Sequence, residues 1–238
     1  MHVHLGLSPD GGNMTWERFQ RFFKGLPITH AVMFPIDEKN PGPSYQRIND
    51  RIAAIVRKHR NVLGFCRLNP REEDAAYREF KRCMKLGFRG VKLHPRSERF
   101  APYEAEDLIS AVEKEKVPVL IHTSHEHHCH PLTWEAIFSR HKKMYFILGH
   151  AGKDAYREAA LVAQHCPNVF LDTSTLSFHR TAYLFRTVGA AKIVFASDAP
   201  YSHPRIEIMK YDMILGDHKE ARRRIYQENP KKVLGGLP

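Results

Sequence analysis

Residues 117–123 read VPVLIHT, and this stretch shows the pattern that decides the fold. It is a short apolar run, rich in β-branched residues, that ends on a polar side chain. Such a run predicts a buried strand, because it is too short for a buried helix and polar residues bound it. Six more stretches share this character: 29–36, 62–68, 88–94, 145–150, 169–173 and 193–198. Residues 1–4 form an eighth, incomplete one.

Segments with helical spacing separate these strands. Ile48, Ile52 and Ile55 lie on one apolar face, and Ala76 and Phe80 begin another. Further helices are expected at 16–24, 104–115, 134–141, 155–165, 182–188, 206–215 and 219–227. Strand–helix alternation predicts an α/β fold with a parallel sheet. Eight such units over residues 1–238 indicate a single (β/α)8 TIM barrel, whose first strand is expected to be truncated. A doubly wound open sheet is the alternative, but no glycine-rich phosphate loop follows the first strand.

Composition narrows the class of protein. Of the 238 residues, 42% are hydrophobic and 26% are charged, which is typical of a globular chain and not of a disordered one. No apolar run is long enough to span a membrane and no basic-then-apolar stretch opens the sequence, so neither a membrane span nor a secretory signal is expected. Four scattered cysteines without a C-x-x-C pair indicate a reducing compartment, so a cytoplasmic location is expected.

The formal net charge of +11 favours anionic partners. The basic runs at 222–224 and 142–143 are each expected on a solvated helix face, and no nucleic-acid-binding motif accompanies them. We therefore expect a small anionic molecule as the partner, with neither nucleic acid nor membrane, and a homodimer as the one assembly to consider.

Polar residues gather where the predicted strands end, which is the end of a (β/α)8 barrel that carries chemistry. His2 and His4 are two residues apart, as are Lys92 and His94, so each pair points to one face of its strand. The other strand-end residues are His122, His150, Asp172, Ser174 and Asp198. Imidazoles and one carboxylate that converge in this way suit Zn²⁺, Fe²⁺ or Mn²⁺ better than Ca²⁺ or Mg²⁺.

Taken in order, these motifs resemble the amidohydrolase superfamily, in particular its small TIM-barrel branch of metal-dependent hydrolases and decarboxylases related to aminocarboxymuconate semialdehyde decarboxylase. The resemblance extends over nearly the whole chain. The motifs that carry it are HVHLG (2–6), GVKLHP (90–95), VLIHT (119–123), LGHAG (148–152), VFLDTS (169–174), FASDAP (195–200) and ENP (228–230). The chain departs from the family in having Met1 directly before His2, where the family has several apolar residues, and Ala196 in place of glycine.

The resemblance implies a metal-dependent hydrolase that attacks a C–O or C–N bond with a metal-activated water. It implies one divalent ion, most simply zinc, with manganese or iron as alternatives, held by His2, His4, His122 and Asp198. Asp198 would also move the proton of the water, and His150 would orient the water or polarise the substrate carbonyl. Lys92 and His94, with Arg96 nearby, would bind a substrate carboxylate.

Several alternatives stay open on sequence alone. A non-oxidative decarboxylase would use the same ligands. A TatD-like nuclease fits the basic charge but has Glu where this chain has Lys92, and a metal-free binding barrel would use none of these residues. Lys92 carboxylated by carbon dioxide could bridge two ions, one of them bound by His122 and His150. The polar run 125–130 and residues 201–203 are expected in loops above the barrel mouth.

Overall fold

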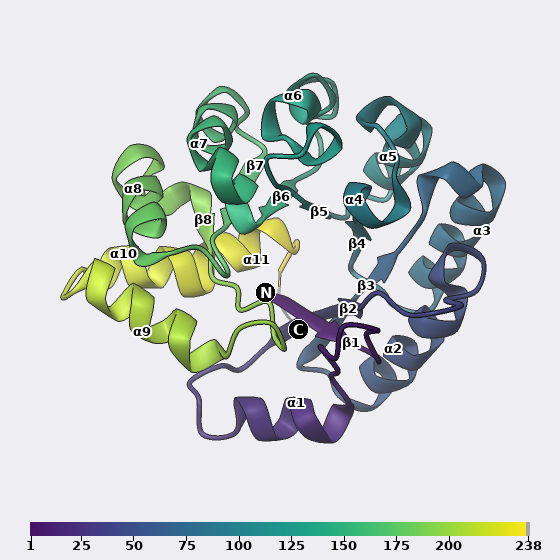
Figure 1. The fold of residues 1–238 in the computed structure, drawn as a ribbon, viewed down its shortest axis with the longest axis horizontal. Helices are drawn as coiled ribbons and strands as arrows, with labels where there is room; N and C mark the ends of the chain where they lie inside the picture. The colour runs from purple at the N-terminus through teal and green to yellow at the C-terminus, as the bar shows by residue number, and fades with distance from the viewer. Residues whose placement is uncertain (237–238) are drawn as a thin grey trace.

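The computed structural model describes residues 1–236 and confirms the predicted fold class. Eight parallel strands form one sheet in sequence order, surrounded by helices (Figure 1). The strands are β1 (His2–Leu5), β2 (Ala31–Pro35), β3 (Val62–Arg67), β4 (Gly90–Leu93), β5 (Val119–His122), β6 (Phe146–Gly149), β7 (Val169–Asp172) and β8 (Ile193–Val194). β1 has four residues, as do β4 to β7, so the first strand is no shorter than most of its neighbours.

The helices lie outside the sheet, close to their predicted positions. They are α1 (Trp16–Phe23), α2 (Gln46–Lys58), α3 (Glu73–Lys85), α4 (Pro95–Glu98), α5 (Glu106–Lys114), α6 (Pro131–Arg140), α7 (Tyr156–His165), α8 (Phe178–Val188), α9 (Pro204–Leu215), α10 (Lys219–Arg223) and α11 (Asn229–Val233). The helix expected at 219–227 is interrupted, because α10 passes into a π-helical turn at Arg224–Glu228. None of the described helices is long and apolar enough to cross a membrane.

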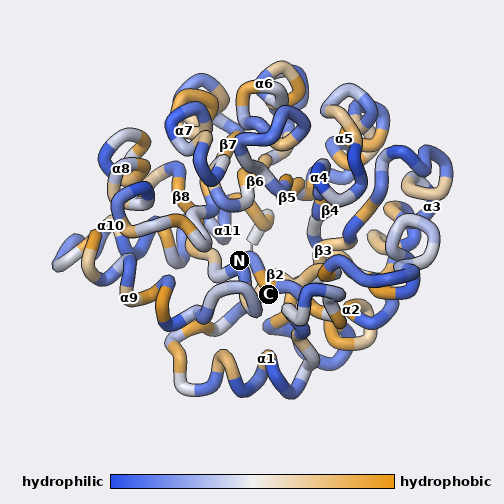
Figure 2. Tube along the Cα trace, in the orientation of Figure 1, coloured by the Kyte–Doolittle hydropathy of each residue, from blue (hydrophilic) through white to orange (hydrophobic). Residues whose placement is uncertain are grey.

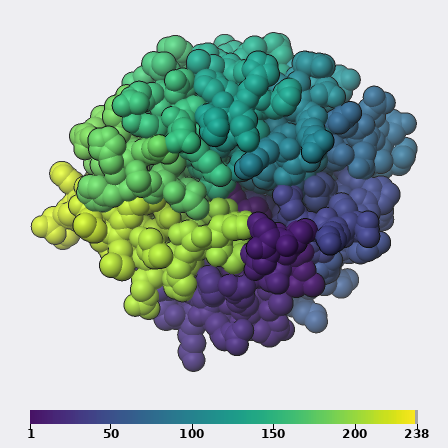
Figure 3. Space-filling view, in the orientation of Figure 1, coloured from purple at the N-terminus to yellow at the C-terminus, as the bar shows by residue number. Residues whose placement is uncertain are grey.

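The barrel closes between β1 and the residues that follow β8. The strand predicted at 193–198 ends at Val194, and Phe195 donates its backbone N–H to Ile225 instead. Beyond that point the chain pairs with β1: Asp198 N donates to His2 O at 2.8 Å, and His4 N donates to Ala199 O at 2.8 Å. Figure 3 shows the N-terminal segment (purple) against the yellow-green segment after β8. This closure places Asp198 beside the two histidines of β1.

Apolar side chains fill two layers, and Figure 2 shows blue and orange residues alternating along the helices. One cluster packs between the strands and helices, and the other lies inside the barrel. The inner cluster includes Phe34, Phe65, Leu120 and Phe170. Because side chains alternate along a strand, His122 and Asp172 point to the same side as Leu120 and Phe170. His122 and Asp172 thus lie at the carboxyl ends of their strands, next to the inner apolar cluster.

Candidate metal centre

Two histidines of β1 and one aspartate after β8 meet at a single point. His2 Nε2 and His4 Nε2 lie 3.2 Å apart, and each lies 3.0 Å from Asp198 Oδ1. All three residues are buried. Among residues 1–236, they form the one group of three potential ligands close enough to hold a metal ion. The structure therefore brings together three of the four predicted ligands.

The contact of His2 with Asp172 fits a cation between these atoms. The Nδ1 of His2 lies 2.5 Å from Asp172 Oδ2, so Nδ1 is the donor to that carboxylate and Nε2 is the ring atom left to bind a metal ion. Burial raises the pKa of Asp198, but His150 and His2 outweigh it and hold that pKa well below its ordinary value. Asp198 is therefore ionised. In the neutral ring the His2 Nε2 lone pair would face this carboxylate, and a cation bound between the two would stabilise that arrangement.

His150 follows β6 and contributes a neutral imidazole. Its Nδ1 lies 3.3 Å from Ser174 O and 3.2 Å from Thr175 Oγ1. The Thr175 hydroxyl donates to Ser174 O, so Nδ1 of His150 carries the proton and Nε2 is left as an acceptor. Burial lowers the pKa of His150 to about 4. A neutral ring with an open Nε2 can accept a proton or a hydrogen bond. The predicted role of His150, to orient the water or polarise the substrate carbonyl, stays a prediction.

Three residues around this centre have left-handed backbone conformations that non-glycine residues rarely adopt. The φ angles are 63° at His150, 64° at Thr175 and 58° at Asp198. Such conformations cost on the order of 1–3 kcal/mol each and concentrate at functional sites. Two of these residues, His150 and Asp198, are the ones predicted from sequence as catalytic, and that role stays a prediction.

His122 and His94 stack beside the group of three. Their ring centroids are 4.0 Å apart, and the centroid of His122 lies 4.9 Å from that of His150. His122 is not in the group that could hold a metal, but its Nε2 is buried without a hydrogen-bond partner. Its role as a fourth ligand stays a prediction. His94 Nδ1 accepts from Ser97 N at the start of α4, which leaves Nε2–H as a donor.

Lys92 lies inside the barrel with its amine unsatisfied. The residue is 0% exposed, its Nζ has no hydrogen-bond partner, and it lies 4.9 Å from the centroid of the Phe34 ring. Burial lowers the pKa of Lys92 to about 7, with a smaller contribution from Arg67. A buried amine without a partner is costly unless a ligand supplies one. Lys92 and the Nε2–H of His94 are therefore two donors suited to an anion.

Sequence reasoning missed a buried charge network at the end of β3. Arg67 is 0% exposed and donates to Glu98 Oε1 through Nε at 2.9 Å and through Nη2 at 2.6 Å. It also pairs with Asp37, and its guanidinium lies 4.4 Å from the centroid of the Tyr45 ring. Asp37 accepts from the Ser97 hydroxyl at 2.8 Å, which ties the network to α4. Arg67 lies one residue before the end of the predicted strand 62–68, and that position was the available signal.

A cleft of about 760 Å³ opens above these residues. It is lined by His4, His94, His122, His150 and Asp198, with Arg96 and Tyr201 further out. Arg96 pairs with Glu126 at 3.2 Å, so its charge is already partly neutralised. The volume is within the range of small-molecule sites.

The two loops predicted above the mouth have structural roles. In the 125–130 loop, His130 caps α6 and His125 lies 3.5 Å from Asp154. Within the described residues this loop holds no group of three potential metal ligands. His203 caps α9 and Ser202 donates to Glu207, while Tyr201 alone of residues 201–203 lines the cleft.

Comparison with known proteins identifies a matching family and several similar solved structures. A family model described as Amidohydrolase matches residues 21–236. A search of curated protein sequences finds no significant match. Among solved structures, 2,6-dihydroxybenzoate decarboxylase from Rhizobium superposes with a TM-score of 0.74 at 17% identity, over 94% of this chain and 89% of that one.

Two further solved structures were determined with manganese. Dihydroxybenzoic acid decarboxylase from Polaromonas sp. JS666, with manganese and 2-nitroresorcinol, has a TM-score of 0.74 at 17% identity, over 98% of this chain and 96% of that one. 5-Carboxyvanillate decarboxylase from Novosphingobium aromaticivorans DSM 12444, with manganese and a nitrobenzoic acid, has a TM-score of 0.72 at 16% identity, over 92% and 79%. At these identities the likeness establishes the barrel fold.

Proposed function

Because the chain belongs to the amidohydrolase family, we propose that it is a metal-dependent enzyme that decarboxylates a small anionic acid without oxidising it. The proposal of a bound metal ion rests on three potential ligand atoms that lie within 3.2 Å of one another: His2 Nε2, His4 Nε2 and Asp198 Oδ1. His122 would complete the ligand set. Hydrolysis was the principal expectation from sequence, but the similar structures named as decarboxylases favour the alternative.

Imidazole and carboxylate donors suit manganese, zinc or iron(II), and manganese is the ion named in two of the similar structures. We therefore propose that the single bound ion is either manganese or zinc. When bound, a divalent ion would supply positive charge that stabilises negative charge developing on the substrate.

The residues of this chain would bind the acid and handle its proton. Lys92, whose buried Nζ has no hydrogen-bond partner among the described residues, and the Nε2–H of His94 would hold the carboxylate. Decarboxylation breaks the bond between this carboxylate and the carbon that bears it. The electron pair stays on that carbon, which then takes up a proton. Lys92, as an ammonium, would supply this proton, whereas His150, with Nε2 open, would accept one.

The test is release of carbon dioxide from a panel of hydroxybenzoic and unsaturated carboxylic acids. We expect metal-reconstituted protein to release carbon dioxide from at least one of them, and Asp198→Ala to release none. Asp107→Ala, which alters an exposed aspartate of α5, is the matched control and should keep full activity. Turnover by Asp198→Ala at the wild-type rate would contradict the proposal.

Hydrolysis of a C–O or C–N bond is the second candidate. It is favoured by Asp198, because an ionised carboxylate next to a metal can accept a proton from attacking water. Hydrolysis of lactones, esters or amides, with no carbon dioxide from any acid in the panel, would establish this candidate in place of the first.

A further inference from the structure

A second cavity, of about 910 Å³, lies away from the histidine cluster. It opens where β2 and β3 begin, whereas the cleft of the candidate metal centre lies where those strands end. Helices α1, α9, α10 and α11 and the π-helical turn at Arg224–Glu228 complete its wall. No residue lines both cavities. A ligand in this second cavity would therefore not occupy the catalytic cleft.

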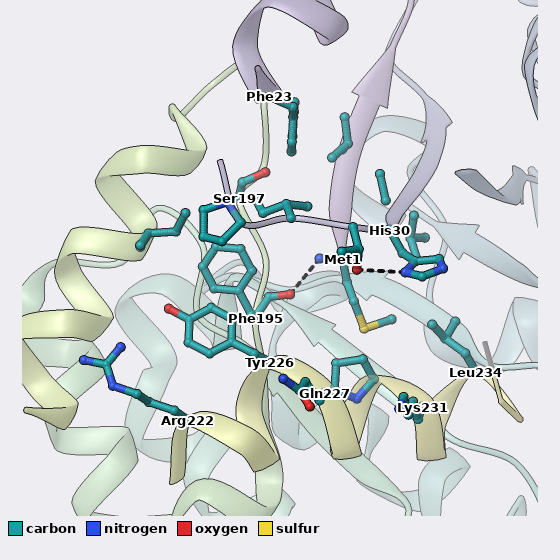
Figure 4. Close-up of a pocket in the computed structure, with 18 of the residues that line it drawn as sticks. Met1, Phe23, His30, Phe195, Ser197, Arg222, Tyr226, Gln227, Lys231 and Leu234 are labelled. Atoms are coloured by element: carbon teal, nitrogen blue, oxygen red, sulfur yellow. Dashed lines mark hydrogen bonds between the residues drawn. The ribbon is translucent and has the colours of Figure 1, made fainter. Parts of the chain in front are cut away.

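The inner wall of this cavity is apolar. Val32, Leu63, Phe195 and Leu234 line it, and each is buried in the protein core. Figure 4 shows Phe195 and Tyr226 on one side of the cavity, and their ring centroids are 4.8 Å apart. Leu234 lies across from them, on the turn that follows α11 (Figure 4). A wall of this kind favours an apolar ligand body, since each buried methylene contributes about 0.8 kcal/mol.

The outer wall is basic. It holds Lys219, Arg222, Arg223 and Lys231 but only one carboxylate, Asp212. Arg222 already pairs with Asp212 at 2.5 Å. Lys219 and Lys231 are exposed, and no carboxylate of residues 1–236 lies within 4.0 Å of either amine. These two ammonium groups therefore face the solvent at the edge of an apolar cavity, an arrangement complementary to a negatively charged head group.

We propose that this cavity binds an amphipathic carboxylate, in which an acyl chain lies against Val32, Leu63 and Leu234 and the carboxylate lies near Lys219 and Lys231. The volume is in the range of small-molecule sites. Apolar walls alone would accept a neutral or cationic amphiphile equally well. Arg222 pairs with Asp212, and Arg223 pairs with Glu220 and Glu228. Lys219 and Lys231 therefore select the anion, because a cationic head group would meet their like charges.

Isothermal titration calorimetry tests this with sodium decanoate, below the concentration at which it forms micelles, added to the full-length metal-loaded protein. One decanoate should bind per chain. Decyltrimethylammonium has the same chain with the opposite charge, and it should bind about tenfold more weakly or not at all. Equal affinities would overturn the choice of an anion.

Variants locate the bound decanoate. Lys219→Glu combined with Lys231→Glu should weaken binding about tenfold, whereas Lys114→Glu, at an exposed lysine of α5 outside both cavities, should not. Ile28→Trp, which fills part of the cavity, should also weaken binding, and Leu132→Trp on the exposed face of α6 is its control. Decanoate that binds these variants as it binds the wild type, but is lost in Lys92→Met, would lie in the catalytic cleft and would overturn the proposal.

Discussion

Asp172 fixes the orientation of the His2 ring. Its Oδ2 lies 2.5 Å from His2 Nδ1, and both side chains are 0% exposed. The pKa of Asp172 falls below its ordinary range because the interaction with His2 outweighs the effect of burial. This carboxylate therefore accepts from Nδ1–H and directs the Nε2 lone pair toward Asp198 and His4.

The first prediction concerns this pair. Asp172→Asn preserves the shape of the side chain but removes the charge that fixes the His2 tautomer. Metal affinity should fall about 10- to 100-fold, as is usual when a partner of a metal-binding histidine is altered. Competition with a chelator of known affinity measures this directly. Asp107→Asn on the surface of α5 is the control, and an Asp172→Asn protein with wild-type affinity would show that the contact does not orient a ligand.

The second prediction is a loss of stability in mild acid. The pKa values of His4 and His150 are lowered to about 4, chiefly by burial. An unfolded histidine titrates near 6.5, so between about pH 6.5 and pH 4 the unfolded chain binds protons that the folded chain does not. The free energy of unfolding of the metal-free protein should therefore fall as pH drops through this window.

Between pH 7.5 and pH 5 the decrease should be about 2 kcal/mol for each of these two histidines. Urea denaturation at pH 7.5, 6 and 5 measures it, and His150→Asn should reduce the slope. A free energy of unfolding that stays constant from pH 7.5 to pH 5 would mean that these rings are not buried as neutral groups.

The third prediction separates the role of Lys92 in binding from any role in holding metal. Lys92→Met replaces a buried, unpartnered amine with an apolar chain of similar length. The free energy of unfolding should rise by about 1–2 kcal/mol, because the cost of burying the amine is removed. Turnover should be lost or KM should rise, while the metal content stays constant. Loss of metal, with activity restored by a short carboxylic acid, would instead favour a carboxylated Lys92 that bridges two ions.

The fourth prediction concerns the buried ion pair between Arg67 and Glu98. Glu98→Gln leaves the guanidinium without its closest buried charge partner, so it should reduce the free energy of unfolding by about 3–5 kcal/mol. Glu115→Gln breaks an exposed pair with Lys81 of the same 2.6 Å length, and should cost at most about 1 kcal/mol. Similar losses for the two variants in urea denaturation would show that burial does not set the strength of this pair.

The strand ends could be predicted from sequence because a local pattern reports them. In VPVLIHT the alternation along the strand places His122 on the side of Leu120, and the structure agrees. The same reasoning found His2, His4 and Asp198.

Sequence reasoning could not identify Arg67 and Glu98 as partners, since they are 31 residues apart and only the packing of α4 against the barrel brings them together. Asp172 was noted at a strand end, but its role depends on a contact with β1 across 170 residues.

The end of β8 was misjudged for a related reason. Residues 193–198 read as one continuous strand, but Phe195 pairs with Ile225 and Asp198 adopts a left-handed conformation. Both features depend on chain that is distant in sequence. At this part of the site, tertiary contacts and not the local strand propensity of the sequence determine the backbone conformation.

The metal content of purified protein and of one variant tests the central claim most directly. Elemental analysis after reconstitution with manganese or zinc and removal of the excess should find one equivalent of bound ion per wild-type chain. Asp198→Ala should retain little or none, because it removes the one carboxylate among the three converging ligand atoms. Equal metal content in the wild type and Asp198→Ala, or none in either, would contradict the account.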